Sequence, residues 1–296
     1  MNAEIGVTPS QEPHDHWLDK PVFGWWQALT IEKLLVILIL AVTLLTRFYD
    51  LGARTMSHDE VNHVVPSYTL ETYVYDPVTH GPFQFHAIAF SYFLFGDSDF
   101  SARVPAAVFG VAVVAFTLFA WKRYLGRVGA LIASFLFMIS PYILFYSRYT
   151  RNEIFIVFWG LVMLWLFLRY LESGEKKFLL WLTLIIAMHY ADKATSYIFT
   201  AEALIFLAVL FVLEALHKPW SESRTRSNFL ISLLVMLLAV LGLGGLYLLS
   251  ADGLAGIPTS ALLALGVLLI AGLVLMILNL VRGLGWGQIR LMRSFD

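Results

Sequence analysis

The chain has 296 residues, of which 59% are hydrophobic and only 14% are charged, and its formal net charge is -1. Soluble domains carry about 25% charged residues, so most of this chain is suited to lipid rather than water. The small net charge gives no reason to expect a nucleic-acid partner. The absence of cysteine excludes disulfides, thiolate metal sites and cysteine nucleophiles.

Residues 1–30 contain acids, prolines and histidines rather than the basic and apolar regions of a signal peptide. They predict a loosely ordered cytoplasmic tail. The tail ends in Phe23-Gly24-Trp25-Trp26, whose aromatic rings suit the interface between membrane and water.

The remainder of the chain predicts an all-α, polytopic membrane protein, because a transmembrane helix needs about 20 mainly apolar residues. Eight segments meet or approach this length: Leu34–Tyr49, Val104–Trp121, Val128–Tyr146, Ile154–Leu171, Phe178–Tyr190, Tyr197–Leu216, Phe229–Ser250 and Ser260–Val281. A ninth apolar segment, Phe83–Phe95, is shorter and contains Gln84, His86 and Ser91. It suits a membrane-parallel helix better than a span.

The distribution of Lys and Arg sets the orientation, because cytoplasmic loops carry an excess of both. If Phe83–Phe95 does not cross the membrane, one side receives 14 of the 20 basic residues. The other side receives Arg47, Arg54, Arg103, Arg148, Arg151 and Lys193. This arrangement places both termini in the cytoplasm and a long loop, residues 50–103, on the extracytoplasmic face. The predicted regions are the tail 1–30, a main membrane module 31–216 and further transmembrane helices 217–296.

The first polar motif of the outer loop is Ser57-His58-Asp59-Glu60-Val61-Asn62-His63, which precedes an apolar stretch typical of an amphipathic surface helix. Adjacent acids point in different directions. One of Asp59 and Glu60 would therefore act as general base, while the other orients it or binds a metal. His63 shares a helix face with both acids. The alternative is that Ser57 or Asp59 simply caps the helix.

The second motif, Tyr75–Phe83, contains Pro77, Gly81 and Pro82, which predict a tight turn into a helix. His80 would then stand at the start of that helix, where exposed amides and the helix dipole favour an anion such as phosphate. The alternative is a rigid turn with a solvent-facing histidine.

The third motif, Tyr146–Glu153, joins two predicted spans and contains Arg148, Arg151 and Glu153. Charges this close to hydrocarbon are costly unless they are paired or functional. Arginine is suited to a bidentate grip on phosphate. The alternative is a surface ion pair at a helix end.

The fourth motif, His189–Ser196, interrupts an apolar run with Asp192 and Lys193. A buried ion pair that holds the bundle together is the alternative to a functional role.

All four motifs fall on one predicted face. Acids, histidines and cations at a membrane surface suit a substrate with a phosphate head and a lipid tail. A carboxylate would take a proton from an acceptor hydroxyl, and cations would stabilise the departing phosphate.

The order and spacing of these motifs resemble the membrane glycosyltransferases of the C-type superfamily. The nearest kin are the protein O-mannosyltransferases, the lipid A aminoarabinose transferases and, most closely, a flippase-activity-associated family. The matching residues are His58-Asp59-Glu60, His80-Gly81-Pro82-Phe83, Arg103-Val104-Pro105, Ser147-Arg148-Tyr149 with Glu153, and Lys193. Mannosyltransferases carry aspartate where this chain has Glu153, which is a departure from the pattern.

The resemblance covers about residues 31–216. It implies an inverting transfer of a sugar from a polyprenyl-phosphate donor in the bilayer to a protein or glycolipid acceptor. The reaction would take place on the extracytoplasmic face of the plasma membrane. Asp59 and Glu60 are the predicted catalytic acids, with Asp59 the base or a metal ligand. The predicted ligands of the lipid phosphate are His80, Arg148, Arg151 and Lys193.

Some members of the superfamily bind a divalent metal through the first-loop acid and the acid after the third span. The resemblance therefore implies Asp59 and Glu153 as metal ligands, with His63 or His80 as additional candidates. Oxygen ligands alone would suit magnesium or manganese, and a histidine would also suit zinc. Members are generally longer, so the resemblance also indicates a fragment or a truncated relative.

The alternative function is that of a non-catalytic accessory subunit of a lipid-linked-sugar flippase or transporter. Inverted repeats and polar residues within spans are typical of transporters. Here no repeat is evident, and the spans after Tyr197 are nearly free of charge. An inactive scaffold is a third alternative.

Overall fold

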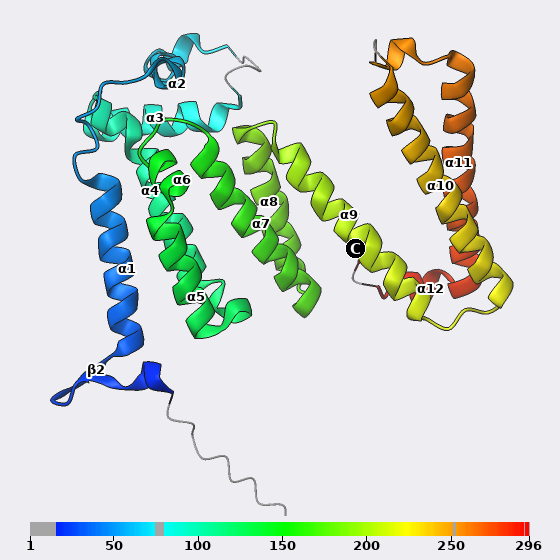
Figure 1. Cartoon of the computed structure of the whole chain (residues 1–296), viewed down its shortest axis with the longest axis horizontal. Coiled ribbons are helices and arrows are strands. Elements are labelled where there is room, and N and C mark those ends of the chain that lie inside the picture. The colour runs from blue at the N-terminus through cyan, green and yellow to red at the C-terminus, as the bar shows by residue number, and fades with distance from the viewer. Residues whose placement is uncertain (1–15, 75–79, 251–252, 293, 296) are drawn as a thin grey trace, which may run out of the picture. The chain divides into compact units, whose positions relative to one another are not determined.

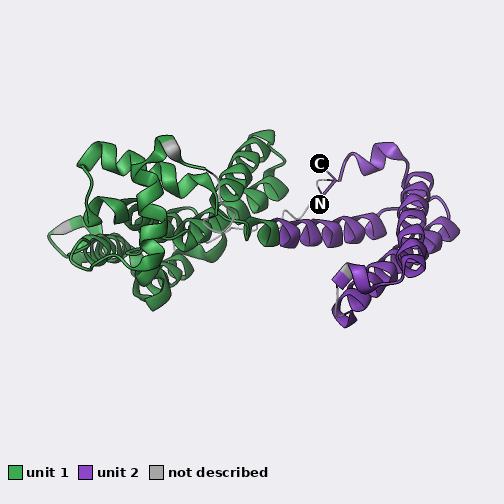
Figure 2. Ribbon diagram, turned by 90° about the horizontal axis from the view of Figure 1, so that it is seen from above, with its two compact units in different colours: residues 1–199 green, residues 200–296 purple. Residues whose placement is uncertain are grey.

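The computed structural model describes residues 16–74, 80–250, 253–292 and 294–295, and it is helical almost throughout (Figure 1). The predictions for residues 1–15 and for Tyr75–Thr79, which includes Pro77, lie outside the described residues. The chain divides into two compact units, Met1–Phe199 and Thr200–Asp296 (Figure 2). The division falls within helix α9.

The first unit begins with a small hairpin and continues as helices. Its elements are a 3-10 helix Trp17–Asp19, β1 Pro21–Phe23, β2 Trp26–Thr30, α1 Ile31–Phe48, α2 His58–Tyr68, a 3-10 helix Leu70–Thr72, α3 Pro82–Phe95, α4 Asp99–Phe119, α5 Lys122–Ile139, α6 Pro141–Tyr146, α7 Glu153–Ser173 and α8 Lys176–Asp192. The two strands pair antiparallel. The predicted aromatic anchor around Trp25 therefore falls in and beside this hairpin.

The second unit contains most of α9 and two long helices. Its elements are α9 Ser196–His217, α10 Ser223–Leu249, a 3-10 helix Gly253–Gly256, α11 Thr259–Leu284 and α12 Trp286–Ile289. The short connection makes α10 and α11 antiparallel neighbours. A Cβ at Gly272 would lie 3.2 Å from the Ser232 carbonyl oxygen, so these two helices approach each other closely.

Five helices in the described residues are long and apolar enough to span a membrane: α4, α7, α9, α10 and α11. Only 6% of the most apolar window of α11 is buried within the protein, so most of its apolar surface needs lipid. The chain is thus an integral membrane protein.

The prediction of eight spans is not confirmed. Helix α8 has 17 residues, which is short for a bilayer of ordinary thickness. Helices α1 and α5 each contain three charged side chains: Glu32, Lys33 and Arg47 in α1, and Lys122, Arg123 and Arg127 in α5.

The third predicted span, Val128–Tyr146, is broken in two. Helix α5 ends at Ile139, and Pro141 opens the separate helix α6. Proline lacks the N–H needed to continue a helix and disfavours the helical conformation of the residue before it, Ser140. The break allows the chain to turn before the third polar motif.

Helix α4 is the centre of the first unit. It packs against α1 and α5 on one side and α7 on the other, and α8 packs against α7. Figure 1 shows α3 running across the ends of the long helices rather than alongside them. This is the predicted helix Phe83–Phe95, whose place at the membrane surface stays a prediction.

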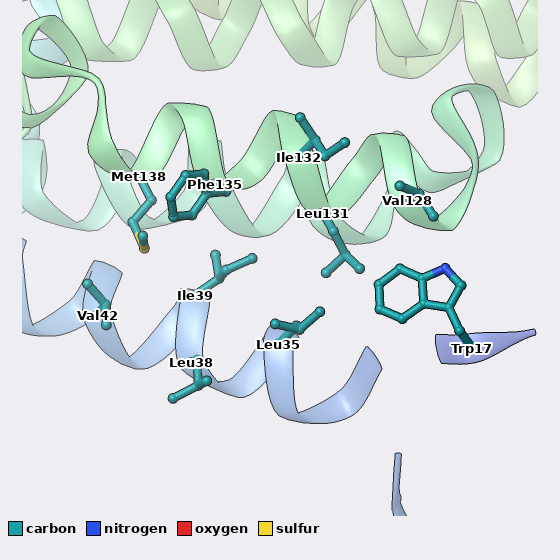
Figure 3. A pocket seen from close by; sticks show the side chains of 10 residues that line it. All are labelled: Trp17, Leu35, Leu38, Ile39, Val42, Val128, Leu131, Ile132, Phe135 and Met138. Atoms are coloured by element: carbon teal, nitrogen blue, oxygen red, sulfur yellow. The ribbon is translucent and has the colours of Figure 1, made fainter. Parts of the chain in front are cut away.

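An apolar groove of about 470 Å³ runs between α1 and α5 (Figure 3). Leu35 and Ile39 face Leu131 and Phe135 across it, and Trp17 closes one end. Its ten lining residues include no acid, base or histidine. The groove is therefore separate from the polar motifs and offers no acid–base chemistry.

Candidate active site

The first motif opens helix α2 through a capping box. The Ser57 hydroxyl accepts from the Glu60 amide at 3.4 Å, and the Ser57 amide donates to Glu60 Oε2 at 3.1 Å. Of the two capping alternatives, Ser57 is the cap. The capping role leaves Asp59 free to face outward, and its side chain is 53% exposed.

Glu60 is fully buried and bound by several donors. Arg103 from α4 grips it with Nε–Oε1 at 2.8 Å and Nη2–Oε2 at 3.1 Å, and Arg54 Nη2 adds a contact of 2.6 Å. Burial alone would raise the pKa of Glu60. Hydrogen bonds from Arg103 and from the amides of Ser57 and Thr150 outweigh that effect and hold its pKa below the ordinary value.

The third motif docks on the start of α2 through three successive residues. The Tyr149 hydroxyl lies 2.7 Å from Ser57 Oγ, and the Thr150 amide donates to Glu60 Oε1 at 3.2 Å. Arg151 Nη1 donates to Asp59 Oδ2 at 2.7 Å. The first and third motifs, far apart in sequence, thus form one surface at one end of the helices.

The side chain of Ser147 in the third motif packs closely against helix α4 at Gly110. A Cβ at Gly110 in α4 would lie 2.2 Å from Ser147 Oγ, so a larger residue there would push the third motif away. The Thr150 hydroxyl also donates to the Ala102 carbonyl of α4, at 3.3 Å. Helix α4 therefore positions the segment that carries Arg151.

The fourth motif joins this surface through Lys193. Lys193 Nζ donates to Glu153 Oε1 at 2.9 Å, and Glu153 Oε2 lies 3.6 Å from Arg151 Nε. Asp59, Arg151, Glu153 and Lys193 therefore form one continuous set of ion pairs, which we call the charge network. It links the outer loop to the starts of α7 and α9. The predicted alternative of an ion pair that holds the bundle together matches the contact of Lys193, whose partner is Glu153 rather than its neighbour Asp192.

The second motif is tied to the same place by Gly81. The Gly81 amide donates to the Asp192 carbonyl at 2.8 Å. A Cβ at this position would lie 2.1 Å from the Ala191 carbonyl oxygen, so only glycine fits. His80 precedes it with a φ of 72°, a conformation that is rare for residues other than glycine. The site thus includes a strained histidine beside the end of α8.

His63 and His80 each have a lowered pKa. Burial is the main cause for His80, and the positive charge of Lys193 adds to it. Burial also dominates for His63, whose Nδ1 lies 2.9 Å from the Asp59 carbonyl. A carbonyl only accepts, so Nδ1 carries the proton and Nε2 is the basic nitrogen. Nε2 has no hydrogen-bond partner among the described residues.

Arg148 does not join the charge network. Its guanidinium donates to the carbonyls of Thr46 and Tyr49, each at 2.7 Å, and to that of Asp50 at 3.3 Å. These carbonyls terminate α1 and would otherwise lack partners. Phosphate binding by Arg148 therefore stays a prediction that the geometry does not support.

The geometry of the charge network also argues against the predicted metal site. In the described part of the chain, no three His, Asp or Glu side chains gather as a metal site requires. The guanidinium of Arg151 lies between Asp59 and Glu153 and contacts both carboxylates. The arrangement of Asp59, Glu153 and His63 therefore does not fit a bound cation.

Two residues at the site were assigned no role from the sequence. Asn152 is fully buried and donates through Nδ2 to Asp192 Oδ1 at 2.7 Å. Arg103 was matched only as part of a motif, yet it is the main partner of Glu60. An asparagine just before a helix suggests a cap, and nothing in the sequence reveals its burial.

Apolar helices long enough to span a bilayer, with acids and cations gathered at one end of the bundle, define an integral membrane protein with a set of ion pairs at that end. The family model described as dolichyl-phosphate-mannose-protein mannosyltransferase matches residues 79–242. The match covers more than half of the chain, which therefore belongs to this family. Family membership makes the protein a membrane glycosyltransferase and implies a lipid-linked sugar donor.

The matched segment contains the second, third and fourth motifs from His80 onward, whereas Asp59, Glu60 and His63 precede it. The structure joins these earlier residues to the matched segment through Arg103 and Arg151. Comparisons with curated proteins and with solved structures find no match. The family match alone confirms the resemblance to membrane glycosyltransferases, and it does so at the level of the family.

Proposed function

We propose that the protein transfers a sugar, with inversion, from a polyprenyl-phosphate donor to an acceptor hydroxyl on the extracytoplasmic face of the membrane. The observation that carries this proposal is the charge network. It places a half-exposed carboxylate, Asp59, in contact with a cation, Arg151, that is linked through Glu153 to a second cation, Lys193. Family membership supplies the lipid-linked donor.

In the proposed reaction, the acceptor oxygen attacks the anomeric carbon of the sugar as the bond from that carbon to the phosphate oxygen breaks. Asp59 takes the proton of the acceptor hydroxyl. The departing polyprenyl phosphate gains one negative charge, which Arg151 and Lys193 stabilise. His80, beside Lys193, completes the phosphate site.

Glu60 supports this chemistry by positioning the residues around Asp59. Its carboxylate is held by Arg103, and it accepts from the amide next to Arg151, which fixes the position of the third motif. Adjacent acids thus take separate roles: Asp59 faces the substrate, and Glu60 orients the residues around it.

The test uses purified, reconstituted protein and a labelled polyprenyl-phosphate sugar. We expect Asp59→Asn to abolish transfer while donor binding survives, because the variant loses the base and retains Arg151 and Lys193. The matched control is Glu71→Gln, which alters an exposed acid of the same loop. Unchanged turnover in Asp59→Asn would remove the assignment.

Two further measurements test the alternative function and the predicted metal. A lipid-translocation assay in liposomes, run beside the transfer assay, distinguishes an enzyme from an accessory subunit of a flippase. Treatment with EDTA, followed by addition of magnesium, manganese or zinc, tests the predicted divalent metal. The position of Arg151 between the two carboxylates leads us to expect no loss of transfer in EDTA.

A further inference from the structure

A fully buried polar contact adjoins the charge network. Asn152 and Asp192 are both fully buried, and Asn152 Nδ2 donates to the Asp192 carboxylate at 2.7 Å and to its carbonyl at 3.1 Å. The Gly81 amide donates to the same carbonyl at 2.8 Å. One residue therefore ties together the end of α8, the start of α7 and the entrance to α3.

Each partner of this contact is followed in sequence by a member of the charge network. Glu153 follows Asn152, Lys193 follows Asp192, and their side chains meet at 2.9 Å. Two consecutive residues of one segment are thus paired with two consecutive residues of another. The inner pair is wholly buried, whereas the outer pair is about 15% exposed.

Burial disfavours a charge on the inner pair. Burial raises the pKa of Asp192 well above its ordinary value, which outweighs the hydrogen bond from Asn152 and the charge of Lys193. Asn152 and Asp192 bind each other, whereas Lys193 binds Glu153, so the inner and outer pairs use separate partners. The inner pair can therefore hold the segments together while the outer ion pair rearranges.

We propose that Asn152 and Asp192 form a buried clasp that sets the separation of Glu153 and Lys193, which makes Asp192 a positioning residue for donor binding. The role in donor binding depends on the proposed function, whereas the geometric role of the clasp does not. Asp192 touches no reacting atom in this scheme.

The first test compares Asp192→Asn with Asp192→Ala and Asn152→Ala. The asparagine variant keeps an oxygen that can accept from Asn152, so we expect its donor KM to stay within about twofold of wild type. Both alanine variants lose the clasp, and we expect their donor KM to rise about tenfold with a smaller change in kcat.

Two outcomes of this comparison would overturn the proposal. One is an unchanged KM in folded Asp192→Ala, and the other is equal damage from Asp192→Asn and Asp192→Ala, which would mean that the acid itself is used. If neither alanine variant folds, the pair serves folding rather than positioning, and the proposal is withdrawn.

A second test requires no turnover and therefore remains informative if sugar transfer is never observed. The chain contains no cysteine, so Glu153→Cys combined with Lys193→Cys creates a unique pair for a short thiol crosslinker. We expect efficient crosslinking with the natural clasp and with Asp192→Asn, and a marked loss with Asp192→Ala. Equal yields in all three backgrounds would overturn the clasp, whatever the enzymatic result.

Discussion

Asp59 and Glu60 are neighbours in sequence, yet their carboxylates lie in opposite surroundings. Glu60 has no exposed side-chain surface and forms an ion pair with Arg103, whereas Asp59 is about half exposed and forms an ion pair with Arg151. Removing one partner of a buried ion pair leaves an uncompensated charge, while exposed pairs contribute little. The two acids should therefore respond differently to the same substitution.

We expect Glu60→Gln to lower the free energy of unfolding by about 3–5 kcal/mol, because Arg103 is left buried without its anion. The matched change Asp59→Asn should cost no more than about 1 kcal/mol. Thermal unfolding in detergent measures both. Similar losses in the two variants would contradict the burial argument.

Glu60 also predicts a pH dependence of stability. Its folded pKa lies below the ordinary 4.5, so its stabilising effect is fully present above pH 4.5 and is lost as the pH falls through the folded value. The difference in unfolding temperature between wild type and Glu60→Gln should therefore shrink as the pH falls below 4.5. A constant difference over that range would refute the assignment.

At the scale of single residues, the sequence predicts which residue types lie together on one face of the protein, but not which side chains interact. The Ser57–Glu60 spacing was readable as a cap. The distinct roles of Arg148 and Arg151 were not, because both lie in an irregular segment between helices, where side-chain direction has no fixed period. Arg151 contacts Asp59 of α2, whereas Arg148 contacts the carbonyls at the end of α1, and these contacts give the two arginines their different roles.

At the scale of elements, helix ends determine how the site is assembled. Arg47 donates to the carbonyls of Met138 and Phe137 at the end of α5, at 2.9 and 3.1 Å. Arg148 serves the end of α1 in the same way. Two of the six basic residues assigned to the outer face thus satisfy helix carbonyls.

We expect Arg148→Ala to destabilise the protein by about 1.5–3 kcal/mol, because several carbonyls at the end of α1 lose a charged donor. Its donor KM should remain near that of wild type, since Arg148 lies outside the charge network. Lys193→Met should show the reverse pattern, with a raised KM and a smaller loss of stability. A raised KM in Arg148→Ala would restore its predicted role in phosphate binding.

The entrance to α3 supplies another prediction. In Gly81→Ala, the new methyl group would lie 2.1 Å from the Ala191 carbonyl oxygen, so the entrance must move away from α8 and take His80 with it. We expect transfer activity to fall at least about tenfold. The control is Gly244→Ala, where nothing lies within 4 Å of the added carbon. Equal activity in the two variants would show that the contact is dispensable.

The elements themselves were largely predictable, because apolar runs bounded by caps are strong signals. The prediction failed at Ser140, where the apolar run continues into Tyr146 and hides the break that Pro141 imposes. The contacts of α2 with the segment before α7, and the contact of Glu153 with Lys193, could not be predicted, since they depend on which short segments approach each other in space.

At the scale of the whole molecule, the five apolar helices establish membrane insertion, and the distribution of Lys and Arg predicts its orientation. In the first unit, Lys122, Arg123, Arg127, Lys176 and Lys177 lie at the ends of helices opposite to the charge network. Basic loops stay in the cytoplasm. The charge network should therefore face the extracytoplasmic side.

Single cysteines test this orientation directly, because the natural chain has none. In intact cells, we expect Glu71→Cys to react with a membrane-impermeant thiol reagent, and Lys177→Cys to react only after the membrane is permeabilised. Both positions are exposed, so accessibility within the protein does not limit labelling. The reversed pattern would place the charge network in the cytoplasm, where a donor presented on the outer leaflet could not reach it.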